Sequence, residues 1–224
     1  MKRSMVNKLL ENAKQLLSNN GFALPEFGYW SLSEWEQADT ETIQKTMLGW
    51  DVTDFGCDDF YSMGAVLFTI RNGELKSNLG TPYAEKIIII PDGGRLPLHC
   101  HKTKTEDIIN RGGGTFWIQL YLSKSDGQVD RENDVTVYCD GIKKTFGPGE
   151  RVEISKGNSI TLTPGLYHVF GASNGDTVVG EVSSVNDDIT DNYFAETVSR
   201  FSSIEEDEPA LHPLCNEYER LFGN

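Results

Sequence analysis

The stretch GGRLPLHCHKTKTEDIINRGG, residues 93–113, decides how the rest of the chain is interpreted. It holds two of the protein's four histidines, His99 and His101, one residue apart. Residues i and i+2 of an extended strand point to the same side, so these two imidazoles are expected side by side. Glu106, five residues on, reaches that side only if the chain turns between residues 102 and 105. Two nitrogens and one oxygen that converge in this way indicate a divalent transition metal with open coordination positions.

A third histidine, His168, ends the sequence TPGLYH at residues 163–168. Its Pro-Gly pair predicts a turn, and an apolar strand is expected to follow. His168 is therefore the third histidine predicted to bind the metal. His212, in a Leu-His-Pro context near the C-terminus, is predicted to be a packing residue.

Both histidine stretches resemble the two conserved motifs of the cupins. The first motif reads Gly-x5-His-x-His-x4-Glu-x6-Gly and is matched at every position, by Gly93, His99, His101, Glu106 and Gly113. The second reads Gly-x5-Pro-x-Gly-x2-His-x3-Asn and is matched in part, by Gly157, Gly165 and His168. Pro164 is displaced by one residue and Ala172 stands where asparagine is usual. The resemblance implies a jelly-roll β-barrel whose metal is held by His99, His101, Glu106 and His168.

Composition narrows the classes of partner. The formal net charge of the 224 residues is −14, which argues against nucleic acids and anionic membranes as partners. No apolar run approaches the roughly 20 residues that cross a bilayer. The four cysteines form no CxxC pair and no export signal is visible, so free thiols and a cytoplasmic location are expected.

Hydrophobic periodicity predicts mainly β structure. Residues 2–18 have the pattern of an amphipathic helix, and Ser33 and Thr40 are candidate N-caps of two short helices. Short strands are predicted at residues 66–71, 83–90, 116–122, 135–139, 150–154, 159–162, 167–172 and 177–185. The three glycines at 112–114 are predicted to form a tight turn between two strands.

We therefore expect an all-β-dominated fold, a cupin jelly-roll β-barrel with an N-terminal helical extension. Residues 1–56 would form the extension packed on the barrel, and residues 57–190 the barrel with its metal site. Residues 191–224 would cover the barrel mouth, within a single domain overall.

Further stretches resemble one cupin family, the D-lyxose isomerases, over nearly the whole chain. They are MLGWDVTDFG (47–56), LFTIRNG (67–73), PYAEK (82–86), EDIINRGGG (106–114), PGLYH (164–168), GEVSSVNDD (180–188), IEEDEP (204–209) and LCNEY (214–218). The resemblance implies an enzyme that interconverts D-lyxose with D-xylulose, and D-mannose with D-fructose, through a metal-stabilised enediol. It also implies Mn2+, although the donor set accepts Co2+, Fe2+, Ni2+ or Zn2+ as well. A small neutral sugar suits a strongly acidic protein.

Aldose–ketose isomerisation also requires a proton carrier that is not a metal ligand. Lys104, in the turn between His101 and Glu106, is one candidate. By resemblance the base is a carboxylate of the C-terminal segment, with Glu196 the first candidate and Glu205 the second. The candidates for binding sugar hydroxyls are Lys86, Asp187 and Arg200.

Two other readings use the same four ligands. One is an Fe(II)-dependent cupin dioxygenase, which would consume oxygen, and the other is a non-catalytic sugar-binding cupin. Because cupins commonly pair through sheet edges or N-terminal extensions, a homodimer is predicted.

Overall fold

A computed structural model describes residues 1–223. Within them the helices are α1 (Arg3–Asn19), the 3-10 helix η1 (Glu26–Gly28), α2 (Leu32–Gln37), α3 (Glu41–Lys45) and α4 (Tyr218–Phe222). The longer strands are β1 (Gly49–Thr53), β2 (Ala65–Gly73), β3 (Gly80–Ile90), β5 (Glu106–Ser123), β7 (Val135–Cys139), β8 (Ile142–Phe146), β10 (Ser159–Leu162) and β11 (Tyr167–Ser184). The short strands are β4 (His99–Cys100), β6 (Val129–Asp130), β9 (Val152–Ile154) and β12 (Tyr193–Phe194).

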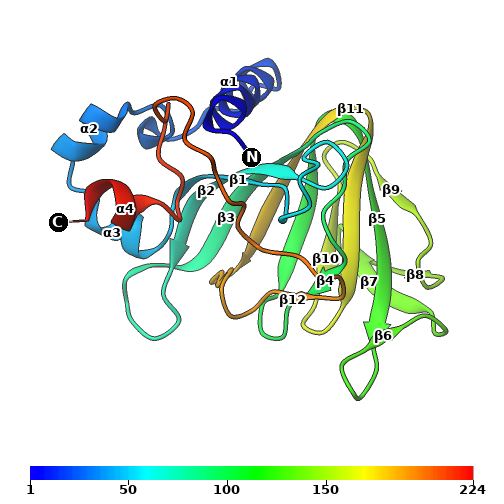
Figure 1. Ribbon diagram of the computed structural model, residues 1–224. Helices are drawn as coiled ribbons and strands as arrows, with labels where there is room; N and C mark the ends of the chain where they lie inside the picture. The colour runs from blue at the N-terminus through cyan, green and yellow to red at the C-terminus, as the bar shows by residue number, and fades with distance from the viewer. Residues whose placement is uncertain (224) are drawn as a thin grey trace.

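The strands form an antiparallel sheet in the order β1-β2-β3-β11-β5-β10-β7-β8 (Figure 1). Strands β4 and β9 extend it beside β11 and β5, and β12 pairs with β4. The two longest strands, β5 and β11, pair along most of their lengths and hold the curved sheet together (Figure 1). The predicted β-dominated jelly roll with helices before it is confirmed.

The glycines at 112–114 do not form a tight turn, so that prediction was wrong. They lie inside the continuous strand β5, where Gly112 and Gly113 have φ of 131° and 94°. A Cβ on Gly113 would lie 2.2 Å from the carbonyl oxygen of Asp176, because the backbone of β11 approaches closely there. The glycines thus allow β5 to bend against β11 where the pairing register shifts.

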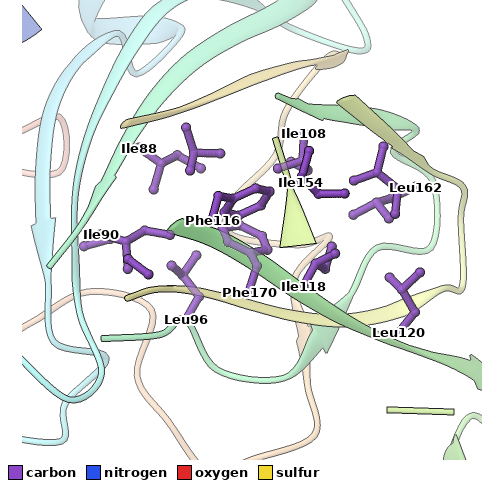
Figure 2. Close-up of a cluster of buried hydrophobic side chains, with 14 of the residues drawn as sticks. Ile88, Ile90, Leu96, Ile108, Phe116, Ile118, Leu120, Ile154, Leu162 and Phe170 are labelled. Atoms are coloured by element: carbon purple, nitrogen blue, oxygen red, sulfur yellow. The ribbon is translucent and has the colours of Figure 1, made fainter. Parts of the chain in front are cut away.

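Two apolar clusters lie on opposite sides of this sheet. The inner one fills the barrel, and its ring side chains, such as Phe116 and Phe170, meet aliphatic side chains from β3, β5 and β10 (Figure 2). The outer one lies under α1, whose Val6, Leu10 and Ala13 recur at helical spacing and are at most 2% exposed. This face of α1 packs against β2 and β3, as its periodicity predicts.

The N-terminal extension contains one strand that the sequence analysis did not predict. Strand β1 lies within residues 1–56 and pairs with β2 from Gly49–Thr69 to Thr53–Ala65. The C-terminal segment returns beside α1, where Arg3 binds Glu206 and Glu217. Within residues 1–223 no helix combines the length and apolar character that a membrane crossing requires.

Candidate active site

Three histidines meet inside one end of the barrel. His99 lies on β4 directly opposite His168 on β11, and His101 follows β4 by one residue. Each offers one ring nitrogen, and these three nitrogens lie within 4.8 Å of one another. The side chains are at most 7% exposed. His99 and His101 thus point to the same side, as their spacing predicts, and the pairing of β4 with β11 brings His168 beside them.

Backbone carbonyls set the tautomer of all three rings. The Nδ1 atoms of His99, His101 and His168 lie 2.8, 2.7 and 3.0 Å from the carbonyl oxygens of Pro97, Asp191 and Leu166. A carbonyl only accepts, so each Nδ1 carries the proton and each neutral Nε2 keeps a lone pair. The Nε2 atoms of His99 and His168 are 3.1 Å apart. Two lone pairs at that distance repel, unless a cation lies between them.

Glu106, the first residue of β5, completes this donor set. Its Oε1 lies 3.3 Å from His168 Nε2 and 3.5 Å from His101 Nε2, and it has no hydrogen-bond partner among the described residues. A buried carboxylate oxygen without a partner is costly. Three imidazole nitrogens and one carboxylate oxygen are a donor set for a divalent transition metal, so these residues fit such an ion.

Burial keeps the histidines ready to bind a cation. Burial lowers the pKa of His99 to about 3 and the pKa values of His101 and His168 to about 4. All three are therefore neutral at pH 7. Burial alone would raise the pKa of Glu106, but the Lys104 ammonium, 2.7 Å away, outweighs it and holds that pKa well below its usual range.

Lys104 is a buried residue of this site and not a solvated surface lysine. Its Nζ donates to Glu106 Oε2 at 2.7 Å, Glu181 Oε1 at 2.9 Å and Asn186 Oδ1 at 3.2 Å. Burial alone would lower the pKa of Lys104, but Glu106, Glu181 and Asp188 together raise it above its usual value. The ammonium therefore stays charged beside the donor set.

A second cluster of charged residues, formed by Lys86, Asp188 and Arg200, lines the same cavity. Lys86 donates to both carboxylate oxygens of Asp188, at 3.1 and 3.0 Å. Arg200 also binds Asp188, at 2.9 Å, and Asp51, at 2.7 Å. Burial opposes ionisation of Asp188, but Arg200 and Lys86 hold its pKa well below the usual range. Asp188 is thus a fixed anion between two cations.

These groups line a cavity together with several apolar side chains. The apolar side chains are those of Phe55, Leu67, Ile88, Leu96, Phe170 and Phe194. The polar lining residues are Lys86, His99, His101, Lys104, Glu106, Glu181, Asp188, Asn192 and Arg200. Such a cavity can bind a small molecule whose hydroxyl groups meet the polar lining residues.

The structure does not bring every predicted residue to this cavity. Glu196 is one-third exposed and holds Arg95 through two hydrogen bonds, at 2.8 and 2.9 Å, outside the lining. Glu205 is exposed beside the N-terminus, where its backbone bridges to Lys2. The Asp187 carboxylate binds Thr190 and the Ile189 N–H of its own segment.

Sequence reasoning missed three polar lining residues, namely Glu181, Asp188 and Asn192, and named none of the apolar ones. Glu181 pairs with Lys86 across β11 and β3, so the two side chains share one face of the sheet. A charged residue inside the apolar run Thr177–Val182 was the one available signal for it. Asp188 and Asn192 lie in a loop, where no periodicity shows which way a side chain points.

The chain is similar to known proteins over nearly its whole length. The family model for D-lyxose isomerase matches residues 1–218. The chain is 45% identical to the D-lyxose/D-mannose isomerase of Escherichia coli O157:H7 over 99% of its length and all of the relative. It is 44% identical to the enzyme of that name from Serratia proteamaculans, over the full length of both.

Solved structures share the fold. The L-ribose isomerase of Acinetobacter sp. DL28 in complex with L-ribose superposes with a TM-score of 0.61 at 14% identity, over 92% of this chain and 98% of the other. The L-ribose isomerase of Cellulomonas parahominis with L-ribose superposes with a TM-score of 0.59 at 16% identity, again over 92% of this chain and 98% of the other.

The fold and the cavity lined by polar side chains, together with these relatives, define an aldose–ketose isomerase. The chain belongs to the D-lyxose isomerase family.

Proposed function

We propose that the protein interconverts D-lyxose with D-xylulose, and D-mannose with D-fructose, by moving a proton between C1 and C2 through an enediol. The supporting observation is the convergence of three neutral histidine lone pairs and one unpartnered carboxylate oxygen, beside a cavity lined by nine polar side chains. His99, His101, Glu106 and His168 would hold a divalent metal, with Mn2+ as the first candidate. Such an ion polarises a carbonyl and stabilises negative charge that develops on neighbouring oxygens.

Glu181 and Lys104 are the proposed proton-transfer pair. Glu181 lines the cavity without belonging to the donor set, and its Oε1 accepts from Lys104 Nζ at 2.9 Å. Glu181 would act as the base, and the charged Lys104 would donate a hydrogen bond to the negative oxygen. Asp188 is a poor base, because Lys86 and Arg200 hold its pKa far below neutrality.

Lys86, Asp188, Asn192 and Arg200 are proposed to bind and orient the sugar hydroxyls. Asp188 and Asp51 together balance the charges of Lys86 and Arg200, so the group offers hydrogen bonds to a neutral ligand without a net charge that would attract an ionic one. Glu196, Glu205 and Asp187 remain sequence-based candidates for these roles. For Glu196 to act, it would have to leave Arg95 and the backbone N–H of Leu98.

The test is a sugar assay on metal-stripped protein under argon. Mn2+ is added back with D-lyxose or D-mannose, and ketose formation is followed. We expect ketose only after metal is added. Oxygen-dependent turnover of another substrate would favour an Fe(II) dioxygenase. Sugar binding without ketose, at full Mn2+ occupancy, would favour a binding protein.

We further propose a cytoplasmic homodimer. The four cysteines of the chain are free in the structure, which suits a reducing compartment. Sedimentation at micromolar concentration is the test of assembly, and a monomer there would contradict the dimer.

A further inference from the structure

Asp191 joins the C-terminal segment to the turn that follows His101. Its carboxylate accepts from the backbone N–H groups of Lys102, Thr103 and Lys104 at 2.9, 3.1 and 3.0 Å. The Thr103 hydroxyl donates a further hydrogen bond at 2.8 Å. Three successive N–H groups that point at one anion form a concave anion site. Asp191 is 7% exposed, so water competes little for these bonds.

The backbone of Asp191 also contacts the donor set. Its carbonyl oxygen accepts from His101 Nδ1 at 2.7 Å, which leaves the His101 Nε2 lone pair toward the other donors. One residue therefore fixes the orientation of His101 and, through the turn, the backbone of Lys104. Partners of this kind orient metal-binding histidines and raise metal affinity.

The segment around Asp191 supplies part of the sugar cavity. Asp188, Asn192 and Phe194 line it, and β12 pairs Phe194 with His99. Docking on the turn helps to place these residues over the cavity, together with the Asp188 ion pairs and the pairing of β12 with β4. Asp191 provides the charged side chain of that docking contact.

We infer that Asp191 is a positioning residue that couples metal binding to the docking of the segment 187–194 over the sugar cavity. The inference rests on the metal site proposed above. If docking raises metal affinity, then metal must stabilise docking by the same factor, because coupling between two equilibria is reciprocal.

The same segment provides a matched control in Asp187. Its carboxylate accepts only from Ile189 and Thr190, three residues away at most, and makes no hydrogen bond to the 102–104 turn. D187A removes a carboxylate from the segment without removing the contact to the metal-binding turn. D191A removes that contact.

The first measurement is a Mn2+ titration of metal-stripped wild type, D191A and D187A, with free Mn2+ followed by EPR. D191A keeps the carbonyl that orients His101 but loses the carboxylate that holds this carbonyl and the turn in place. We expect affinity to fall about 10- to 100-fold in D191A, the range seen when the support of a metal ligand is lost, and less than threefold in D187A. An affinity of folded D191A within threefold of wild type would overturn the inference. If D191A does not fold, T103V removes one hydrogen bond and is expected to weaken Mn2+ binding a few-fold; unchanged affinity in T103V would overturn the inference.

The second measurement follows the segment itself. Chymotrypsin cleavage at Tyr193 or Phe194 is read by mass spectrometry with and without Mn2+. Mn2+ should slow cleavage in wild type and D187A but not in D191A, a pattern that a merely less stable fold would not produce. Equal protection of D191A would overturn the inference. Wild type that binds no Mn2+ would instead overturn the proposed metal site, a different failure that needs no sugar assay to detect.

Discussion

At the scale of single residues, the site contains neutral groups that are suited to hold a cation and other groups that are themselves charged. His99, His101 and His168 are kept neutral by burial, whereas Lys104 and Asp188 are kept charged by their partners. Burial acts on all of them, and the number of opposite charges within reach decides which effect dominates. Glu181 differs from the other cavity carboxylates because it has one cationic partner and no place in the donor set.

Substituting Glu181 tests the proposed base. E181Q keeps the size of the side chain and removes the basic oxygen, so kcat should fall at least about 100-fold while bound metal is retained. Turnover of D-lyxose and metal content by mass spectrometry are the measurements.

E196Q is the matched control, because it makes the same change outside the cavity. Its kcat should stay within about threefold of wild type. Near-normal turnover in E181Q together with loss in E196Q would reverse the assignment and place the base on the C-terminal segment.

At the scale of elements, the bend in β5 connects the end of the strand that lies at the site to the part that packs in the barrel core. Glu106 at the start of this strand belongs to the donor set, while Phe116 and Ile118 beyond the bend fill the core. The bend depends on glycines, since β11 passes too close for a side chain. Geometry at the site therefore depends on backbone packing several residues away from it.

Replacing Gly113 with alanine should destabilise the fold by at least about 2 kcal/mol. Its φ of 94° disfavours a side chain, and the new Cβ would clash with the Asp176 carbonyl. Gly127 has a φ of 84° but open space around it, so G127A shows the backbone cost alone, about 1 kcal/mol. Urea unfolding of both variants measures the difference, and equal losses would contradict the predicted clash.

At the scale of the whole molecule, four buried histidines make stability depend on pH. In the unfolded chain they bind a proton near pH 6.5, whereas burial lowers their pKa in the fold, to about 3 or 4 for the three cavity histidines. Between those values the unfolded state binds more protons. Acidification therefore favours unfolding in that window.

We expect the metal-free protein to lose stability steadily from pH 6.5 to pH 4, with each histidine contributing at most about 1.4 kcal/mol per pH unit. Above pH 6.5 this contribution is constant. Urea midpoints at pH 7.5, 6 and 5 in the presence of EDTA provide the measurement. H168Q, which removes one of these groups, should show a shallower slope; identical slopes would contradict the assignment.

Features that depend on residues close together in the sequence were predictable, and features that depend on distant residues were not. His99 and His101 were found because strand parity acts over two residues, and the Pro-Gly turn marked His168 in the same local way. The α1 periodicity and strands β7 and β10 were predicted for the same reason. Strand β8 was missed, since four of its five residues are exposed and leave no apolar alternation.

The sequence by itself determined the residues of the donor set, because short-range spacing dictates the side on which each side chain lies, and its resemblance to known motifs determined the fold class and the family. Only the tertiary structure decided what faces that donor set. Glu181 meets Lys104 from 77 residues away, and Asp191 meets Lys104 from 87 residues away. Such contacts depend on the pairing of β11 with β3 and β5 and on the path of the C-terminal segment. Both are consequences of packing the whole chain, and no local pattern encodes them.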